Sequence, residues 1–312
     1  MKLCLLACML TIGSLAACGV ASAEDPPVFQ LKWGSPGSGS GQFRFARDLT
    51  ADGAGNIYVA DTENQRVQRF SKDGAYLGEL DSAPSGPAAF GNTLSCAVDG
   101  AGNLYVMDAR GFIDVFDATQ TFVRSWPASV KYLALDPTGQ YLYATVADSI
   151  VKYDVATGGH LRAWVYSVPS PNYYTFAVGP SGNVYISGMN DGDFVAKYTP
   201  DGNLLKAWGG TGTGNGQFNG SRGVAVDATE NVYVGDGNGR VQKFNAEGSF
   251  LSAWGSLGTG DGQFTRDTFA LTTDSAGHVL VFDYDLQRIQ KFVYGITAVR
   301  TSTWGALKDL YR

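Results

Sequence analysis

Short apolar runs separated by turn residues follow one another along most of the chain, and residues 55–70 show the pattern most clearly. Residues 57–59 (Ile-Tyr-Val) are β-branched or aromatic, as strand residues commonly are. Asp61 to Asn64 are turn formers, because Asp and Asn side chains hydrogen-bond their own backbone. Apolar positions resume at Val67 and Phe70. The pattern predicts two antiparallel strands joined by one tight turn.

This unit recurs, so that six copies can be counted. Equivalent positions in successive copies are 47, 38, 42, 48 and 47 residues apart, a period typical of propellers rather than of helical repeats. These positions are Tyr58, Tyr105, Tyr143, Tyr185, Tyr233 and Leu280. Each copy divides into four strands, named a to d in chain order, which in the first copy are Asp48 to Ala51, Ile57 to Ala60, Arg66 to Phe70 and Tyr76 to Leu80. The sequence therefore predicts an all-β fold, a six-bladed β-propeller of four-stranded antiparallel blades.

Aromatic residues repeat in the same register. All tryptophans fall on predicted d strands, where a large ring can pack against the next blade: Trp33, Trp126, Trp164, Trp208, Trp254 and Trp304. Three connections between blades share the sequence Gly-x-Gly-Gln-Phe, and their phenylalanines are expected to plug the gaps between blades: Phe43, Phe218 and Phe264.

Seven d-type strands are available for six blades, so the two ends of the chain compete to close the ring. Phe29 to Gly34 precedes the first a strand, and Val299 to Gly305 follows the last c strand. The N-terminal segment resembles Phe250 to Gly255 closely, including the residues that follow it. We therefore expect the N-terminal strand to complete the sixth blade.

The units resemble NHL repeats over about residues 28 to 305. The resemblance rests on Gly-Asn-Ile-Tyr-Val-Ala-Asp at 55–61, on Arg-Val-Gln at 66–68 and 240–242, and on Gly-Val-Ala-Val-Asp at 223–227. It is strong in the first, fifth and sixth units and weaker in the third and fourth. The resemblance implies a six-bladed propeller, but it implies no single activity, because propellers carry many unrelated functions.

The N-terminus has the features of an export signal. Residues 1–17 combine Lys2 with an apolar run and precede Leu-Ala-Ala-Cys, which resembles a bacterial lipobox with Cys18 as the lipidated residue. Cleavage after Ala23, as in ordinary secretion, is the alternative. The sequence thus predicts a leader at 1–17, a linker at 18–27, the propeller at 28–305 and a tail at 306–312. We expect the protein to be exported to the cell envelope and anchored in the membrane by lipid. The alternative is a periplasmic or secreted protein.

Composition narrows the classes of partner. The chain has 312 residues, a formal charge of −6 and a pI of about 4.9, which disfavours the basic footprint that nucleic-acid binding needs. Cys4 and Cys8 leave with the leader, so Cys96 stands alone if Cys18 carries lipid. The apolar surroundings of Cys96 indicate a buried core thiol. The propeller is expected to be monomeric.

A candidate ligand site lies where the a strands begin, at the mouth of the central channel. Counting back five residues from the aspartate, or Gly179 in the fourth unit, at the end of each a strand reaches Arg47, Leu94, Lys131, Tyr174, Arg222 and Phe269, so basic and apolar side chains alternate around the ring. Arg47, Lys131, Tyr174, Arg222 and Phe269 would suit an anionic ligand, with guanidinium groups for a carboxylate and aromatic walls. An extra residue in the sixth blade leaves Arg266 or Thr268 as alternatives to Phe269. The competing interpretation is that Arg47 and Arg222 neutralise nearby aspartates.

Aspartates end most predicted b strands: Asp61, Asp108, Asp148, Asp236 and Asp283. They could form a carboxylate ring for Ca²⁺, or each could cap its own b–c turn and pair with a strand-c cation such as Arg66, Arg240 or Arg288. Because most units carry one such aspartate, the repetition favours the interpretation that each aspartate caps its own b–c turn. No cofactor is predicted.

Catalytic signals are sparse. The chain has two histidines, His160 and His278, no cluster with zinc-ligand spacing and no Gly-x-Ser-x-Gly elbow. Asp48 is the one obvious acid on the inner strands. The sequence favours a non-catalytic binding or scaffold module whose loop face meets a protein, a glycan or a small anionic ligand. A metal-dependent propeller hydrolase or lyase, similar to lactonases, remains the alternative.

Overall fold

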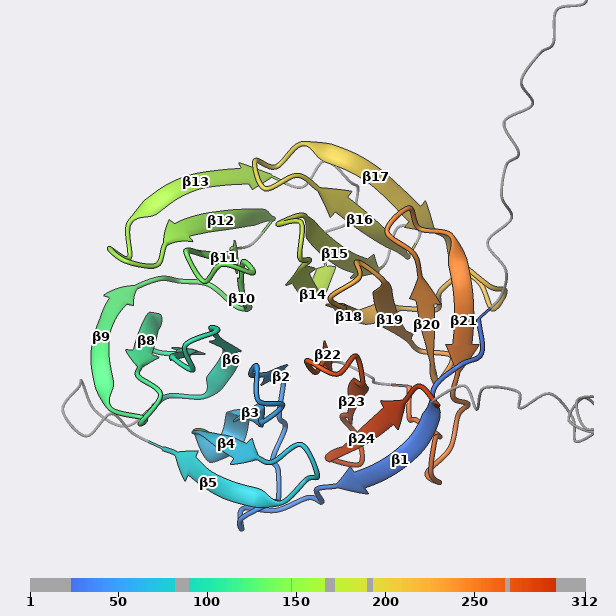
Figure 1. Ribbon diagram of the computed structural model, residues 1–312, viewed down its shortest axis with the longest axis horizontal. Helices are drawn as coiled ribbons and strands as arrows, with labels where there is room; N and C mark the ends of the chain where they lie inside the picture. The colour runs from blue at the N-terminus through green and yellow to red at the C-terminus, as the bar shows by residue number, and fades with distance from the viewer. Residues whose placement is uncertain are drawn as a thin grey trace, which may run out of the picture.

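The computed structural model describes residues 24–81, 90–146, 148–165, 172–189, 193–266 and 270–295, with the side chains of 172–174 and 189 set aside. Six four-stranded sheets stand around a central axis like the blades of a propeller (Figure 1). Every strand pairing within the sheets is antiparallel, so the predicted fold class is confirmed. The leader, the tail, Cys18 and Trp304 lie outside the described residues.

The first three blades follow chain order from the centre outward. Blade 1 contains β2 (Asp48–Ala51), β3 (Ile57–Asp61), β4 (Arg66–Phe70) and β5 (Tyr76–Leu80), with a 3₁₀ turn η1 (Thr62–Asn64) between β3 and β4. Blade 2 contains β6 (Thr93–Val98), β7 (Leu104–Asp108), β8 (Phe112–Phe116) and β9 (Phe122–Pro127). Blade 3 contains β10 (Leu133–Leu135), β11 (Tyr141–Val146), β12 (Ser149–Asp154) and β13 (His160–Val165).

The last three blades complete the ring. Blade 4 contains β14 (Asn172–Val178), β15 (Val184–Met189), β16 (Phe194–Tyr198) and β17 (Leu204–Gly209). Blade 5 contains β18 (Ser221–Val226), β19 (Val232–Asp236), β20 (Arg240–Phe244) and β21 (Phe250–Trp254). Blade 6 contains β22 (Ala270–Thr273), β23 (Val279–Asp283), β24 (Arg288–Val293) and, as its outermost strand, β1 (Val28–Trp33).

The N-terminal strand closes the ring, as predicted. β1 pairs antiparallel with β24, with Phe29 opposite Phe292 and Trp33 opposite Ile289. Figure 1 shows the blue β1 lying alongside the red β24 at the rim. The competing segment, Val299 to Gly305, lies outside the described residues. Because the first strand is hydrogen-bonded to the last blade, this pairing closes the ring.

Apolar side chains fill the spaces between neighbouring blades. One cluster combines Leu49 and Val59 of blade 1 with Leu280 and Phe282 of blade 6. Phe43, from the connection that leads into blade 1, is fully buried between them. The centroids of the Phe43 and Phe282 rings lie 5.7 Å apart. Phe218 and Phe264 are also fully buried, so the predicted plugs are confirmed.

The tryptophans on the outer strands reach across to the next blade. A Cβ placed on Gly74 of blade 1 would lie 3.0 Å from the ring of Trp33, and one on Gly202 of blade 4 would lie 2.4 Å from the ring of Trp164. Both glycines have positive φ, +78° and +85°, in tight c–d turns. Glycine is therefore needed at these positions for two reasons: the turn requires a positive φ, and the indole ring approaches too closely for a Cβ atom.

Within the described residues, no helix is long and apolar enough to cross a membrane.

Candidate functional site

Two kinds of loop share one face of the propeller. Because strands alternate in direction, the connections between blades (d–a) and the turns between strands b and c open on the same side, here called the loop face. The a–b and c–d turns open on the other side. Among the candidate residues that the structure describes, Arg47 and Lys131 precede their a strands and Arg222 is the second residue of β18, so they belong to the loop face.

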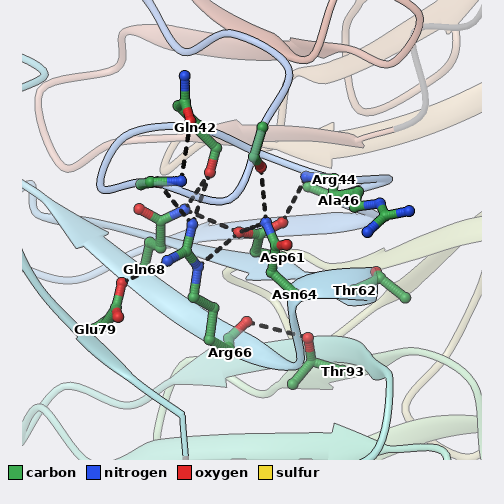
Figure 2. Close-up of polar contacts among 12 residues, drawn as sticks. Gln42, Arg44, Ala46, Asp61, Thr62, Asn64, Arg66, Gln68, Glu79 and Thr93 are labelled. Carbon is green, nitrogen blue, oxygen red and sulfur yellow. Dashed lines mark hydrogen bonds and ion pairs between the residues drawn. The ribbon is translucent and has the colours of Figure 1, made fainter.

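Buried aspartates organise the loop face, and Asp61 shows how (Figure 2). It ends β3 and is fully buried. One carboxylate oxygen accepts the backbone N–H of Arg44 at 2.7 Å. The other accepts hydrogen bonds from Asn64 Nδ2 (2.9 Å), Arg66 Nε (2.8 Å) and Gln68 Nε2 (2.9 Å). Four donors satisfy the buried charge, which would otherwise be costly to desolvate.

The same arginine and glutamine hold the connection between blades. Arg66 donates to the carbonyls of Gly39 (2.8 Å) and Gln42 (2.9 Å), and Gln68 donates to the carbonyl of Gln42 (2.6 Å) (Figure 2). Gln68 Oε1 accepts the N–H of Gly41 at 2.8 Å. The Arg-Val-Gln sequence on strand c therefore shapes the Gly-x-Gly-Gln-Phe connection.

The pairing of a buried aspartate with a strand-c arginine repeats in blades 5 and 6. Asp236 pairs with Arg240 at 3.0 Å and Asp283 with Arg288 at 3.1 Å. The interpretation that these aspartates cap turns and pair with strand-c cations is confirmed for Asp61, Asp236 and Asp283. Strand-c arginines, Arg66 and Arg240, pair with Asp61 and Asp236.

Blades 2 and 3 depart from the pattern. Asp108 is buried, but its partner Arg110 comes from the b–c turn instead of strand c. Asp148 lies beyond the end of β11 and is exposed, so the expectation that it ends its b strand is wrong. It accepts a hydrogen bond from Ser149 Oγ at 3.0 Å. Asp148 is therefore not the buried carboxylate that shapes this loop in blades 1, 5 and 6.

Three of the predicted mouth residues, Arg47, Lys131 and Arg222, have described side chains. Arg47 and Lys131 are exposed at the loop face, and Arg222 is half-buried. The side chains of Tyr174 and Phe269 lie outside the described residues. Arg222 lies at a β-bulge of β18, where an irregular register re-aims the side chain. Among the described residues, Arg222 lines a hollow on the loop face, whereas Arg47 and Lys131 lie outside the linings of that hollow, of the central channel and of the hollow at blades 6 and 1.

The hollow beside Arg222, here called the basic hollow, measures about 290 Å³. It brings together Arg222 of blade 5 and Arg266 of the connection into blade 6. Its lining is Asp193, Thr211, Asn219, Gly220, Arg222, Gly237 and Arg266. Asp193 is buried and has a φ of 33°. The lining thus places two guanidinium groups near one carboxylate. Guanidinium groups are common binding groups for carboxylates and phosphates.

A second hollow, here called the aromatic hollow, lies where blade 6 meets blade 1 and measures about 470 Å³. Its lining is Pro36, Gly37, Ser38, Phe43, Arg44, Phe45, Tyr284, Asp285 and Gln287. The rings of Phe45 and Tyr284 lie 5.6 Å apart and are tilted by 55°. Phe45 is 45% exposed although it is a large apolar residue. Hollows of this kind, with aromatic walls and a few polar groups, are typical binding sites.

Phe45 also has an unusual backbone. Its φ is 51°, in the left-handed region that costs a bulky residue about 1–3 kcal/mol. Counting two residues on from the buried phenylalanine of each connection, the equivalent position in blade 5 is Gly220, with a φ of 75°. Glycine occupies this conformation without strain. The chain therefore keeps an exposed phenylalanine where glycine would be more stable.

The central channel holds the inner acid that the sequence singled out. A cavity of about 290 Å³ is lined by the a strands of all six blades, including Asp48. Asp48 accepts hydrogen bonds from Ser95 Oγ, from the N–H of Cys96 at 3.2 Å and from its neighbour Leu49 N–H at 2.9 Å. Burial raises the pKa of Asp48 to about 7, although these hydrogen bonds oppose the rise. Cys96 is a buried free thiol, as expected.

Within the described residues, no group of three or more His, Cys, Asp or Glu side chains could hold a metal ion. His278 pairs with Asp274 at 2.8 Å in an a–b turn, away from the loop face.

Sequence reasoning missed the residues that give the two hollows their character. Phe45, Tyr284 and Asp193 carry no catalytic motif, and none is in the register that led to Arg47. A signal for Phe45 was present: the connection into blade 1 reads Gln-Phe-Arg-Phe-Ala-Arg, whereas that into blade 5 reads Gln-Phe-Asn-Gly-Ser-Arg. An aromatic residue opposite a glycine in a repeat indicates a position that turn geometry alone does not explain.

Comparison with known proteins supports the repeat and the fold. The NHL repeat family matches residues 43–70. NHL repeat-containing protein 3 from mouse is 38% identical over 66 residues, which cover 20% of this chain and 19% of that protein. The human protein of the same name is 42% identical over 53 residues, covering 16% of this chain and 15% of its own. The chain therefore matches less than a fifth of the length of these relatives.

Solved structures extend the likeness to most of the ring. A structural genomics protein of unknown function from Bacteroides thetaiotaomicron superposes with a TM-score of 0.65 at 19% identity, covering 84% of this chain and 74% of that one. The structure of U3-55K gives a TM-score of 0.59 at 14% identity, covering 80% and 95%. At such identities the likeness concerns the fold alone. The matched repeat and the ring of sheets together show that this chain is a six-bladed β-propeller built with an NHL repeat.

Proposed function

We propose that the protein is a non-catalytic binding module whose loop face receives an acidic group of a protein partner. NHL-repeat propellers generally mediate protein interactions. The observation that carries the proposal is the basic hollow, where Arg222 and Arg266 come from two different blades to one cavity. A guanidinium group can donate two parallel hydrogen bonds to one carboxylate, which makes arginine a common bidentate partner of acidic groups.

The scaffold around the hollow supports this role. Asp236, Arg240 and Gln242 brace the connection that contains Asn219 and Gly220, because Arg240 donates to the carbonyls of Gly214 and Gln217. A braced loop loses little freedom when it binds, so less of the interaction energy is spent on ordering it.

The test uses three probes: a hexaglutamate peptide, glucuronate and inorganic phosphate. Titration calorimetry on the propeller from residue 24 onward should show binding of the peptide that weakens as salt is added, because exposed charges are screened. The double change Arg222→Gln and Arg266→Gln should lower its affinity at least about tenfold, the loss of one charged hydrogen-bonded contact.

The matched control is Arg162→Gln. Arg162 is an exposed arginine on β13 that pairs with Asp201 at 3.7 Å, on the outer rim and away from the loop face. Its change should leave binding unaltered. Equal effects of the control and the double change would contradict the proposal. Binding of glucuronate or phosphate but not of the peptide would replace the protein partner by a small anionic ligand.

We also propose that the protein is exported and that lipid on Cys18 anchors it to a membrane. Glu24 donates its N–H to the carbonyl of Leu251 at 3.0 Å and pairs with Lys243 at 2.6 Å, which ties the chain to the outer strand of blade 5. Only five residues lie between Cys18 and Glu24, so the chain from one to the other reaches at most roughly 20 Å. The anchor would therefore hold the rim of blade 5 near the bilayer.

A further inference from the structure

Blade 2 has a buried acid at a position where the other blades have a neutral residue. Asp114 on β8 lies opposite Val106 of β7, in the same register in which Gln68 on β4 lies opposite Val59 of β3. The equivalent residues of blades 1, 3, 4, 5 and 6 are Gln68, Val151, Ala196, Gln242 and Gln290. Among these six described residues, Asp114 is the one that can ionise.

Two buried carboxylates share one guanidinium group in blade 2. Arg110 donates from Nε to Asp108 at 2.5 Å and from Nη2 to Asp114 Oδ2 at 2.5 Å. Asp108 also accepts the N–H groups of Gly91 (2.9 Å) and of Arg110 itself (3.0 Å). Both carboxylates are fully buried, yet Asp114 Oδ1 has no hydrogen-bond partner among the described residues. Asp114 is therefore the less well satisfied of the two acids, and ionising both is costly.

A neutral Asp114 would resemble the glutamine of blade 1. Gln68 donates to the carboxylate of Asp61 at 2.9 Å and accepts the N–H of Gly41 at 2.8 Å, so it is a donor and an acceptor at once. An ionised carboxylate only accepts hydrogen bonds, whereas a protonated one has an O–H donor as well. One proton therefore gives Asp114 the donor that blade 1 has at this position.

We propose that Asp114 is a proton-operated switch for the connection into blade 2. When Asp114 is neutral, its demand on Arg110 is weak, so Arg110 and Asp108 form one ion pair and Asp108 holds the N–H of Gly91 firmly. When Asp114 is ionised, the two carboxylates compete for Arg110, and the hold on Gly91 weakens. The loop face therefore loosens at blade 2 as pH rises.

The surroundings of Asp114 favour the neutral form. Burial raises the pKa of Asp114, the charge of Arg110 lowers it, and the charge of Asp108 raises it again. The hydroxyl of Ser125, opposite Asp114 on β9, also lowers it. The result is a pKa above the ordinary value of an aspartate.

Other charged side chains near this position are engaged elsewhere. Arg124 of β9 donates to two backbone carbonyls of blade 3. Arg66 of blade 1 pairs with two acids of its own blade. Residues 82–89 of the connection contain no ionisable side chain. Asp114 therefore titrates against one carboxylate and one guanidinium group of its own blade.

The experiment follows Asp114 and Gly91 by NMR from about pH 4 to about pH 8. In protein with ¹³C at the aspartate Cγ, the signal missing from the Asp114→Asn variant identifies Asp114, and we expect it to titrate above the ordinary value of about 3.9. Protection of the Gly91 amide from hydrogen exchange should fall over the same pH range in the wild type and stay constant in the variant. Asp117→Asn is the matched control, since Asp117 is an acid of the same blade that follows β8, and its loss should leave the pH dependence at Gly91 unchanged.

Urea unfolding provides a second measurement. Between the unfolded and the folded pKa of Asp114, the unfolding constant of the wild type should rise relative to that of Asp114→Asn by up to about tenfold per pH unit, because only the folded wild type keeps the proton. The other acids are the same in both proteins, so their titration cancels from the ratio. Asp114→Gln, with the side chain found in blades 1, 5 and 6, should behave as Asp114→Asn does.

Three results would overturn the proposal. The first is a signal of Asp114 that titrates at or below the ordinary value. The second is protection of Gly91 that depends on pH equally in the wild type and in Asp114→Asn. The third is a lower stability of both variants at every pH, because the ionised pair of Asp114 with Arg110 would then be the form that holds the blade together.

Discussion

Asp48 makes the stability of the propeller depend on pH in a direction unusual for a carboxylic acid. Its side chain stands in the wall of the channel and accepts hydrogen bonds from Ser95 and Cys96 of the next blade. Burial raises its pKa from 3.8 to about 7. Between pH 4 and pH 7, the folded protein therefore holds a proton that the unfolded chain has released.

The sign follows from this difference. A group that binds its proton more tightly in the folded state stabilises the protein fully below the unfolded pKa, and that stability is lost as pH rises through the folded pKa. A shift of about 3 pKa units corresponds to about 4 kcal/mol. Asp48 is only half-buried and borders the channel, so the measured effect should be smaller than this value.

The perturbation is Asp48→Asn, which keeps an oxygen to accept the N–H of Cys96 and cannot ionise. Urea unfolding from pH 4.5 to pH 8 should find the variant about as stable as the wild type at the acidic end. At pH 8 the variant should be more stable, by about 1–4 kcal/mol. Asp117→Asn serves as the control, because the pKa of this exposed acid is lowered by its hydrogen bonds with Thr119 and Thr121.

The control should show no change in stability difference between pH 5 and pH 8. A difference between wild type and Asp48→Asn that is constant over this range would refute the reasoning, since it would mean that Asp48 is ionised throughout. A variant less stable than the wild type at every pH would point instead to a hydrogen-bond geometry that an amide cannot reproduce.

Three further predictions concern the repeat and the leader. Asp61→Asn should lower the free energy of unfolding by about 3 kcal/mol in urea titrations, because it leaves the buried charge of Arg66 short of a partner, and a loss under 1 kcal/mol would argue against a structural pair. Gly202→Ala should cost about 2 kcal/mol or more through its positive φ and the indole 2.4 Å away, whereas Gly53→Ala, with nothing within 4 Å, should stay within about 0.5 kcal/mol by the same titration. Cys18→Ser should move the protein from the membrane to the soluble fraction, and unchanged partitioning would contradict the lipid anchor.

The local pattern was enough to predict the ring and most of its joints. A strand period of two, turn residues at fixed offsets and a repeat of 38 to 48 residues are properties of neighbours in the chain, so they are visible without coordinates. The same holds for the phenylalanine plugs and for the aspartates that cap the b–c turns of blades 1, 5 and 6, because each acts within a blade or on the connection beside it. The closing strand was also predictable, since Phe29 to Gly34 repeats a segment found elsewhere in the chain.

Only the tertiary structure decided which side chains share a cavity. Arg47, Lys131 and Arg222 are equivalent in the repeat, yet Arg222 lines the basic hollow and Arg47 and Lys131 do not, because the other lining residues come from blades 4 and 5 and from the connection into blade 6. The pairing of Phe45 with Tyr284 depends on the closure that brings the last blade against the first. Ring closure joins residues far apart in the chain, and periodicity carries no information about which unlike side chains will meet there.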